Sequence, residues 1–557
     1  MVPRSTKFIV VTGGVLSGLG KGITTAAIGH LLKSHLKVVP IKCDGYLNTD
    51  PGTMNPIEHG EVFVQDDGGE VDMDFGHYER FMGINTKFRW NLTMGKVYKK
   101  ILEKERKGEF LGKTVQLIPH VSDVIKEHFY TIAKEENADI IMIEIGGTVG
   151  DMENELYIES VRQLKQEVGR DNVVFIHLTY IPIPTGVNEQ KTKPTQQSVK
   201  ILNERGIWPD IIMARSAEYL TEKNRKKIAL FCNVEPEAVI TGLDVDTVYR
   251  IPLIYDAEGV TAILHRKLGI YSPPKLDGLR KLVNNLDKSK APLTVKLAIA
   301  GKYTDLHDSY ASIIEAITHT KAHVDAAVEI VWIDTTEVEE GRKSIESLME
   351  GIDAVIVPGG FGTRGIEGKI EAVRYCRENK VPFLGICYGM QLAVIEFARN
   401  VCDMKQAHTT EVEDDCGKSV DSPVVCILPD QIGVTQKGAT MRLGGHDVHV
   451  LKGSRAHGIY GSEVIRERFR HRYEVNPDYV AELKRRGIVF SGYTPDKDIM
   501  QIMELPNHPF FVGSQFHPEL TSRLESPSPL FLHLVKTAIE VKRANTLGPK
   551  EVENKVS

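Results

Sequence analysis

The chain has 557 residues, more than one hydrophobic core usually organises, so two or three separately folded domains are expected. Hydrophobic residues make up 41% and charged residues 26%, which excludes a disordered or fibrous protein. The formal charge of -6 argues against a general nucleic-acid or membrane-surface binder. Seven cysteines are too few for a disulfide scaffold, and neither a signal peptide nor a membrane span is evident, so we expect a cytoplasmic, reduced protein.

Short apolar segments alternate with amphipathic helical patterns along the whole chain. These segments are residues 8–11, 38–41, 139–145, 173–178, 297–300, 354–357 and 383–386. Nearly continuous apolar strands between helices indicate α/β domains with doubly wound, mostly parallel sheets. Two prolines and a charge-rich stretch predict a linker at residues 271–294. We therefore expect one domain at 1–270, a second at 295–541 and a flexible tail at 542–557.

The first chemical signal is a Gly-rich loop at residues 13–22, between a strand and the start of a helix. Backbone N–H groups of such a loop converge on phosphate, and Lys21 can reach its outer oxygens. The loop is not a strict Walker A motif, because Val15 replaces the first glycine and Gly22 replaces the metal-binding hydroxyl. Ser17, Thr24 or Thr25 could supply that hydroxyl instead. A tight turn without a ligand is the alternative.

Two segments could supply carboxylates for a metal ion bound to a nucleoside triphosphate. One is the acidic turn at residues 66–74, for which composition alone favours a solvated loop. The other is Glu144, at the carboxyl end of an apolar strand, where parallel sheets bind their ligands. Residues 191–196 bring two lysines together after a Pro-rich loop, which fits either a second triphosphate or an exposed turn.

The second half carries a nucleophile motif. Residues 385–389 read Gly-Ile-Cys-Tyr-Gly between an apolar strand and a helix, a sharp turn that would present Cys387 at a helix N-terminus. The N–H of Tyr388 and a second donor from Gly359 or Gly360 could bind an oxyanion. Downstream, His517 could take the thiol proton and Glu519 could orient the imidazole. The other cysteines have no such setting and fit buried structural thiols.

In the order of these motifs the chain resembles the CTP synthase family over roughly residues 5–540. The resemblance is carried by residues 13–22, 58–64, 76–80, 112–116, 144–151, 191–196, 228–234, 385–389, 471–476 and 506–509. It implies an amidoligase domain with a P-loop-like, dethiobiotin synthetase-like fold, followed by a class I glutamine amidotransferase domain with a flavodoxin-like fold. The implied reaction is ATP-dependent amination of UTP to CTP through a 4-phosphorylated intermediate, with ammonia channelled from glutamine hydrolysis.

The resemblance also implies residue roles in the first domain. Lys21 and Lys42 would act in phosphoryl transfer, and Asp74 and Glu144 would bind Mg²⁺. ATP would contact Gly18, Leu19, Gly20, Lys21, Gly22, Ile23 and Asp74, with Arg215, Asp244 and Val245 on the adenosine side. UTP would contact Ser17, Lys191, Thr192, Lys193, Pro194, Thr195, Gln196 and Lys227. CTP, as feedback inhibitor, would contact Ser17, Asp151, Met152, Glu153, Lys191, Gln196 and Lys227.

In the second domain the resemblance implies a Cys387–His517–Glu519 triad. Glutamine would contact Gly360, Cys387, Tyr388, Gly389, Met390, Gln391, Glu411 and Arg472. Family members are activated by GTP near the domain junction, and the matching loop of this chain contains Phe361 and Arg364. They assemble as homotetramers and often as filaments, so the same is expected here, without nucleic-acid or membrane partners.

The chain departs from the family pattern at a few positions. Gly45 replaces a common proline, Met152 and Asn154 replace isoleucine and serine, and Tyr388 replaces a usual leucine. Tyr388 matters little if it acts through its backbone N–H, and the other changes bear on feedback and UTP positioning rather than on the reaction itself. Two alternatives stay open at this point: a related glutamine-dependent ligase acting on another carboxyl or carbonyl substrate, and a filament-forming protein with an inactive site.

Overall fold

The chain divides into two compact units in the computed structural model, which describes residues 6–289, 291–302, 307–362, 364–412, 417, 419–428, 431, 440–494 and 499–547. The first unit comprises Met1–Pro51 and Asp74–Lys281, and the second comprises Gly52–Met73 and Leu282–Ser557. The sequence analysis assigned residues 52–73 to the first domain, but in the structure this segment clusters with the second unit.

The first unit is built on a sheet of order β5-β2-β6-β1-β7-β8-β9, in which every neighbouring pair of strands is parallel. The strands are β1 (Lys7–Gly13), β2 (Val38–Asp44), β5 (Asn91–Thr93), β6 (Ile140–Ile145), β7 (Val173–Tyr180), β8 (Ile211–Ser216) and β9 (Val239–Leu243). The apolar residues 8–11 of β1 are completely buried, as expected for a strand covered on both faces.

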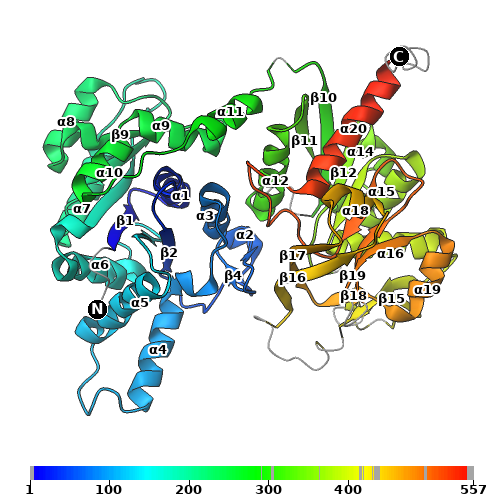
Figure 1. The fold of residues 1–557 in the computed structure, drawn as a ribbon, viewed down its shortest axis with the longest axis horizontal. Helices are drawn as coiled ribbons and strands as arrows, with labels where there is room; N and C mark the ends of the chain where they lie inside the picture. Colours follow the sequence, from blue (N-terminus) through cyan, green and yellow to red (C-terminus); the bar gives the residue numbers. More distant parts are fainter. Residues whose placement is uncertain are drawn as a thin grey trace. The chain divides into compact units, whose positions relative to one another are not determined.

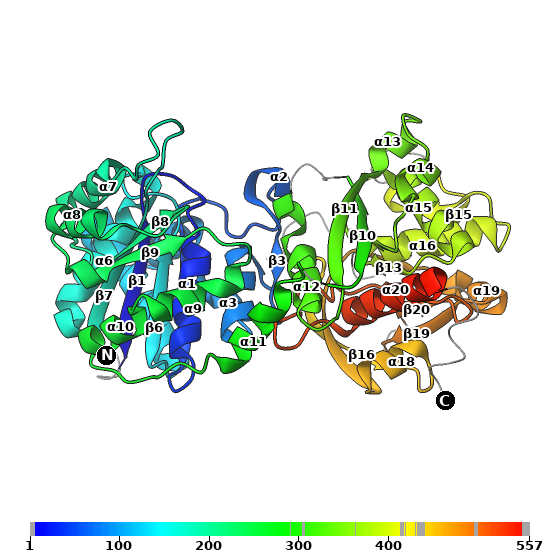
Figure 2. The ribbon, with the colours of Figure 1, turned by 90° about the horizontal axis from the view of Figure 1, so that it is seen from above.

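Helices cover both faces of this sheet (Figure 2). They are α1 (Lys21–Leu32), α3 (Asp74–Met82), α4 (Met94–Arg106), α5 (Ser122–Glu135), α6 (Glu155–Val168), α7 (Lys193–Glu204), α8 (Glu222–Cys232), α9 (Ile251–Ala257) and α10 (Val260–Leu268). The alternation of strands and helices places the carboxyl ends of the parallel strands at one edge, where loops are free to bind ligands.

The second unit contains a mixed sheet of order β11-β10-β12-β13-β21-β20-β19-β16-β17. Its strands are β10 (Thr294–Gly301), β11 (Ala327–Asp334), β12 (Ala354–Val357), β13 (Phe383–Ile386), β16 (Arg442–Val450), β17 (Val464–His471), β19 (Val489–Tyr493), β20 (Met500–Glu504) and β21 (Phe511–Ser514). The pairs from β11 to β21 are parallel, and those from β21 to β17 are antiparallel. A small separate sheet is formed by β14 (Ala407–Thr409), β15 (Ser422–Ile427) and β18 (Tyr473–Val475).

Two hydrophobic cores lie on opposite faces of the large sheet. Along β12, Val355 and Val357 belong to one core, and Ala354 and Ile356 belong to the other, as the two-residue period of a strand requires. In the described part of the chain after β10, the helices of this unit are α12 (Ala311–Lys321), α13 (Thr335–Glu339), α14 (Ile345–Met349), α15 (Ile366–Asn379), α16 (Tyr388–Asn400), α18 (Arg455–Tyr460), α19 (Pro477–Arg486) and α20 (Pro529–Leu547) (Figure 1 and Figure 2).

Arginines on β17 attach segment 52–73 to the rest of the second unit. This segment contains α2 (Pro56–His59), β3 (Phe63–Val64) and β4 (Glu70–Val71). Arg466 pairs with Asp66 at 3.0 Å, and Arg470 pairs with Glu70 at 2.8 Å. Between them, Arg468 is 1% exposed and donates to the carbonyl oxygen of Val64 at 3.1 Å. Since side chains two residues apart in a strand share a face, three arginines of one edge strand all reach this segment.

The expected fold class is confirmed: both units are α/β, and each apolar segment singled out from the sequence forms a strand. The proposed linker contains α11 (Asp277–Leu286). The proposed tail starts inside α20, and its part at 548–557 lies outside the described residues. Every helix in the described ranges is too short or too polar to cross a membrane.

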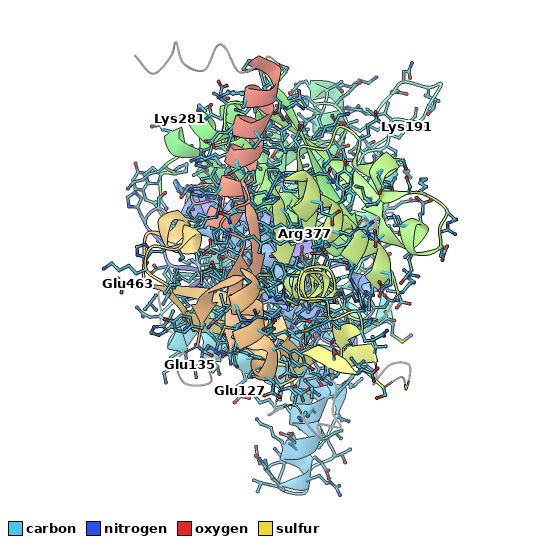
Figure 3. All side chains as sticks on the ribbon, turned by 90° about the vertical axis from the view of Figure 1, so that its right-hand side faces the viewer. Glu127, Glu135, Lys191, Lys281, Arg377 and Glu463 are labelled. Carbon is cyan, nitrogen blue, oxygen red and sulfur yellow. The ribbon has the colours of Figure 1, made fainter. Side chains whose placement is uncertain are left out.

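A buried ion pair joins α15 to α16 and generates a stability prediction. Arg377, labelled in Figure 3, binds the carboxylate of Glu396, which is completely buried, at 2.8–3.1 Å. Arg377→Ala leaves this charge without its partner, so we expect the free energy of unfolding to fall by about 3 kcal/mol. Arg374→Ala is the matched control, because Arg374 pairs with Glu371 on the exposed surface and should change stability by less than about 1 kcal/mol. Thermal unfolding of the full chain measures both, and equal effects would contradict this assignment.

Candidate active sites

The first candidate site lies where neighbouring parallel strands end. The loop from β1 to α1 turns through left-handed backbone conformations, with φ of 73° at Gly18 and 86° at Gly20, which caps α1. Glycine adopts such angles without a steric penalty. The loop therefore delivers the free N–H groups of the α1 N-terminus to the sheet edge, the arrangement that binds phosphate.

An uncharged network supports the base of this loop. A Cβ atom on Gly14 would overlap the hydroxyl of Ser198. Ser198 is hydrogen-bonded to His177 at 2.8 Å, and the other ring nitrogen of His177 is hydrogen-bonded to Thr12 at 2.9 Å. Burial, with a further effect from Lys21, lowers the pKa of His177 to about 3, so the imidazole is neutral near pH 7.

Lys21 starts α1 and points back toward the loop after β6. Its Nζ donates a hydrogen bond to the carbonyl oxygen of Gly147 at 2.7 Å, and only 8% of the residue is exposed. Burial lowers the pKa of Lys21, an effect that the charge of Glu144 opposes. An ammonium group taken out of water in this way gains from an anionic partner, and the outer phosphates of a nucleotide on the loop would provide one.

Lys42 is the centre of a buried charge cluster formed by three elements. From β2 its Nζ contacts Asp74 at the start of α3, Glu144 on β6 at 3.0 Å and Asp44 at 3.9 Å. Tyr78 donates a hydrogen bond to the other oxygen of Glu144. Burial raises the pKa values of Asp44 and Glu144, whereas Lys42 outweighs burial at Asp74 and keeps its pKa low. The predicted residues Lys42, Asp74 and Glu144 are therefore brought together.

This packing explains why Gly22 stands where a strict Walker A motif has a hydroxyl. A Cβ atom at residue 22 would overlap the carboxylate of Asp74. The carboxylate occupies the space in which a Ser or Thr side chain would hold a metal ion. Thr24, one of the alternative hydroxyls, is hydrogen-bonded to Tyr255 at 3.0 Å and so faces α9.

The donor set fits Mg²⁺ together with phosphate. Asp74 and Glu144 offer hard oxygen atoms, and the ammonium of Lys42 between them indicates that the pair attracts a cation. Within the described ranges there is no group of three or more His, Cys, Asp or Glu arranged as metal ligands. The protein would therefore contribute two carboxylates, with phosphate oxygens and water completing the shell.

Two members of this cluster were missed by the sequence analysis as site residues. Asp44 ends β2, and β2 pairs with β6 so that Lys42 lies beside Glu144. A carboxylate at the end of a buried strand is the same signal that identified Glu144, and it could have identified Asp44. Tyr78 lies one turn into α3 and carries no such signal, because only the fold brings its hydroxyl to Glu144.

A small cavity beside the phosphate loop has a volume of about 100 Å³. Arg215 crosses it, donating to Asp244 at 2.8 Å and to the carbonyl oxygen of Gly18 at 3.0 Å. The lining includes the residues expected on the adenosine side together with apolar neighbours: Leu19, Ile23, Arg215, Leu243, Asp244, Val245 and Val248. Apolar walls with a few polar groups suit a nucleoside base.

Glu189, near the expected UTP segment, interacts with three lysines. Lys191 pairs with Glu189 at 2.6 Å and projects from the surface (Figure 3). The hydrogen bond and charge of Lys191 lower the pKa of Glu189, and the charges of Lys223 and Lys227 lower it further, so all three ammonium groups act on one carboxylate. A triphosphate could displace this single carboxylate and bind several lysines. Lys223 was not among the predicted residues.

Other members of the UTP set are occupied with local structure. Thr192 accepts a hydrogen bond from Gln196 at 3.0 Å, and the buried Thr195 donates to Thr179 on β7 at 3.0 Å. Lys193 and Pro194 form the first turn of α7, whereas Ser17 is exposed in the phosphate loop.

The departures from the family pattern contact one another. A Cβ atom on Gly45 would lie 2.7 Å from both the Oδ1 atom of Asn154 and the Cβ atom of Glu153. The larger Asn154 is thus accommodated where residue 45 has no side chain. Asp151 accepts hydrogen bonds from the N–H and hydroxyl of Thr148 at 2.8 and 2.5 Å, while Met152 is 86% exposed.

The second candidate site is centred on Cys387, between β13 and α16. This residue has φ of 52° and ψ of -101°, a strained conformation for a side chain with a Cβ atom. Its N–H donates to the carbonyl oxygen of Ser514 at 2.6 Å, which holds the turn against β21. The thiol accordingly lies at the N-terminus of a helix, as the motif predicted, and Sγ is 3.5 Å from the carbonyl oxygen of Arg470 and 3.6 Å from Nε2 of Gln515.

The glycines on either side of Cys387 permit close backbone contact. A Cβ atom on Gly385 would lie 2.7 Å from the carbonyl group of Gly389, and one on Gly389 would overlap the carbonyl oxygen of Val357. The helix therefore begins directly against the ends of β12 and β13. Any side chain at these positions would displace the turn that carries the thiol.

His517 and Glu519 approach the same turn. The Nδ1 atom of His517 is hydrogen-bonded to Glu519 at 2.7 Å. A Cβ atom on Gly359 would lie 3.5 Å from Cβ of Cys387 and 3.7 Å from Nε2 of His517, so the thiol and the imidazole flank this glycine. Burial alone would lower the pKa of His517, but the charges of Glu519 and Cys387 outweigh it and raise the pKa to about 10. The imidazole is therefore protonated near neutral pH.

A cavity of about 290 Å³ opens at the thiol. Its polar lining includes Gly360, Cys387, His517 and Glu519, and its apolar lining includes Val62, Val64, Tyr310 and Ile313. The apolar valines come from segment 52–73, which explains why sequence reasoning did not connect them with the cysteine. The volume accommodates a small polar metabolite.

Other residues of the predicted glutamine set make hydrogen bonds within the second unit. Glu411 is buried and accepts a hydrogen bond from the N–H of Gly362 at 2.8 Å. Gln391 donates to the carbonyl oxygen of Tyr473 at 2.8 Å, and Arg472 donates to Thr440 at 3.1 Å. The side chain of Met390 is completely buried in the core, so that residue could reach a ligand only through its backbone.

Comparison with known proteins identifies the family. The family model for the CTP synthase N-terminus matches residues 7–270, and that for class-I glutamine amidotransferase matches residues 305–537. A CTP synthase of Borreliella burgdorferi is 55% identical over 540 residues, which cover 96% of this chain and all of that protein. The chain belongs to the CTP synthase family. Members of this family are glutamine-hydrolysing ligases.

Other CTP synthase relatives agree. The CTP synthase of Thermococcus gammatolerans is 51% identical over 543 residues, covering 96% of this chain and 99% of that protein. Among solved structures, the glutaminase domain of Trypanosoma brucei CTPS with bound acivicin is 33% identical, with a TM-score of 0.40, and covers 44% of this chain and 94% of that domain. The residues matched by the CTP synthase N-terminus model include the first candidate site. Those matched by the class-I glutamine amidotransferase model include Cys387, His517 and Glu519 of the second.

The pKa of His517 provides a test of the second site. Glu519→Gln removes the carboxylate that raises this pKa, so the imidazole should lose its proton at a lower pH and stabilise the Cys387 thiolate less. We expect alkylation of Cys387 by iodoacetamide at pH 7 to slow by about tenfold. This factor corresponds to a fall of one unit in the pKa of His517. Mass spectrometry of the labelled chain gives the rate. Glu482→Gln, a substitution at a surface residue of α19, is the control, and an unchanged rate in Glu519→Gln would contradict the assigned pairing.

Proposed function

We propose that the chain catalyses the ATP-dependent amination of UTP at position 4 to give CTP, with ammonia from the hydrolysis of glutamine. The observation that carries this proposal is the presence of two complementary reaction centres on one chain. A phosphate loop with a buried lysine–carboxylate cluster lies in the first unit, and a strained cysteine with a His–Glu pair lies in the second. Family membership over nearly the whole chain supports the choice of substrates.

In the first unit, ATP would bind along the Gly-rich loop, with its base toward Arg215 and Asp244. UTP would bind at the phosphate loop and at the lysines around Glu189. The uracil 4-oxygen is a poor leaving group, and transfer of the γ-phosphoryl group from ATP turns it into phosphate, a good one. Attack of ammonia at carbon 4 then expels phosphate and gives CTP.

Positive charge is the main contribution of the chain to phosphoryl transfer. Lys21 and Lys42 would neutralise charge as the γ-phosphoryl group moves, since catalysis of this reaction is mostly positioning and electrostatics. Asp74 and Glu144 would hold Mg²⁺ once Lys42 turns toward the phosphate. The bound ion would supply electrostatic stabilisation of the phosphate oxygens.

In the second unit, the Cys387 thiolate would attack the amide carbon of glutamine while His517 holds the thiol proton. The tetrahedral oxyanion would accept hydrogen bonds from backbone N–H groups of Gly360 and Tyr388. His517 would then donate its proton to the leaving nitrogen, which departs as ammonia and leaves a thioester. Water hydrolyses the thioester to glutamate and restores the thiolate.

Ammonia must reach the synthetase site without becoming ammonium, because ammonium has no lone pair with which to attack. The apolar side of the cavity at Cys387, formed by Val62, Val64 and Ile313, supports its passage in neutral form. An apolar wall disfavours charged ammonium and tolerates the small neutral molecule. We therefore propose that ammonia is channelled along this side of the cavity.

Regulation and assembly are part of the same proposal. CTP would inhibit at Asp151, Met152 and Glu153, and GTP would activate near Phe361 and Arg364. The strongly exposed apolar side chains Leu111, Leu117, Ile118 and Met152 support assembly into a homotetramer, and filaments could follow. Six cysteines in the described part of the chain are free thiols, which supports a reducing, cytoplasmic setting.

The decisive assay mixes the purified chain with UTP, ATP, Mg²⁺ and glutamine and follows the ultraviolet absorbance change from UTP to CTP. Cys387→Ala should abolish CTP formation from glutamine, because it removes the sulfur atom that forms the thioester, and should retain at least about half of the rate from free ammonia. Loss of both activities in a folded variant would refute the division of labour.

Lys21→Met should stop CTP formation from both nitrogen sources. It removes the charge expected to neutralise the transferring phosphoryl group, so we expect a loss of about 1,000-fold. Glutamine hydrolysis, measured as glutamate release, should persist because the second site is intact. Near-normal synthesis from ammonia would contradict the phosphate role of Lys21.

A further inference from the structure

Lys369 is a buried cation to which neither the motifs nor the proposed mechanism assign a task. It lies in the first turn of α15 and is only 2% exposed. Its ammonium group makes no hydrogen bond or ion pair with the part of the chain that the structure describes. An unpaired buried charge costs several kcal/mol, so such a group usually acts on something beside it.

The surroundings of Lys369 belong to the glutaminase centre. Nζ lies 5.6 Å from the ring centroid of Tyr388, the residue that follows the nucleophile. A Cβ atom on Gly360 would lie 3.9 Å from the same Nζ. Thus one ammonium group lies near both residues from which oxyanion donors are expected, and its face-on position over the Tyr388 ring is an attractive cation–π arrangement.

The loop around Gly360 is held by other charged groups as well. Lys302 donates to the carbonyl oxygen of Phe361, and the N–H of Gly362 donates to Glu411 at 2.8 Å. These two contacts fix the far side of the loop through hydrogen bonds. Lys369 instead lies next to Gly360 itself, so it acts on this loop through its charge and its packing rather than through a hydrogen bond.

We propose that Lys369 is a positioning residue of the glutaminase reaction: its ammonium group fixes the ring of Tyr388 and the backbone of Gly360 and places a positive charge near Cys387. This inference rests on the proposed glutamine hydrolysis. As the thiolate attacks, negative charge collects on the oxyanion between the backbones of Gly360 and Tyr388, and Lys369 lies near both residues. A fixed cation in a site that excludes water favours that charge without reorganisation.

The effect of Lys369 on glutamine hydrolysis should depend on pH. Burial and the charge of Lys302 lower the pKa of Lys369 to about 7, against the opposing charges of Glu411 and Cys387. The ammonium form is therefore complete well below pH 7 and is lost as the pH rises through 7. His517 keeps its proton over this range, so the triad does not mask the change.

The test compares glutamine hydrolysis by the full-length wild type, Lys369→Met and Lys369→Arg between pH 6 and 9. Methionine keeps the length of the side chain without its charge. At pH 6, kcat/KM for glutamine should fall about tenfold in Lys369→Met, consistent with an indirect electrostatic role. The ratio of wild type to Lys369→Met should approach one near pH 9, where the wild-type lysine is neutral. Lys369→Arg should recover activity at pH 6 and hold it to pH 9.

Ammonia-dependent CTP formation reports on the rest of the enzyme and should be unchanged in each variant. Lys405→Met, at an exposed lysine that pairs with Asp403, is the matched control. A pH-independent loss, or an equal loss with ammonia, would mean a structural role and overturn the proposal. Equal pH profiles of wild type and Lys369→Met would overturn it as well. A wild type that hydrolyses no glutamine would instead refute the proposed function.

Discussion

Close contact between helix starts and strand ends is the constraint on which both candidate sites depend. At the second site α16 begins directly against Val357, and only glycine at position 389 allows this approach. At the first site the turn before α1 packs against Ser198 through Gly14. In each case the missing side chain lets backbone N–H groups and one reactive side chain reach the same edge of a parallel sheet. Lys21 and Cys387 owe their positions to this constraint.

Much of the first site could be predicted because its signals are local. Lys21 lies at a helix start and Glu144 at a strand end, and the sequence pattern around each residue predicts that position. The role of Lys42 needed the family resemblance, since a lysine within a buried strand has no local signature. Tyr78 and the apolar cavity wall at Val62 could not be predicted, because only tertiary packing brings them to their sites.

Two of the departures from the family pattern lie at one place in the fold. Read singly, Gly45 and Asn154 suggest a weakened nucleotide site. In the fold they fill each other's space, since the amide of Asn154 lies where a side chain at residue 45 would begin. The two positions are distant in sequence but lie against each other, so a side chain at residue 45 would require Asn154 to move.

The arginine contacts of β17 bear on how this chain could be divided. Segment 52–73 is continuous with the first unit by covalent connection, yet it supplies walls of the cavity at the thiol. A fragment that starts after residue 290 would contain every member of the Cys387–His517–Glu519 triad and still lack Val62 and Val64. It would also leave Arg468 uncovered at an open edge strand. A fragment that contains the whole triad therefore still lacks a segment that the fold around the triad requires.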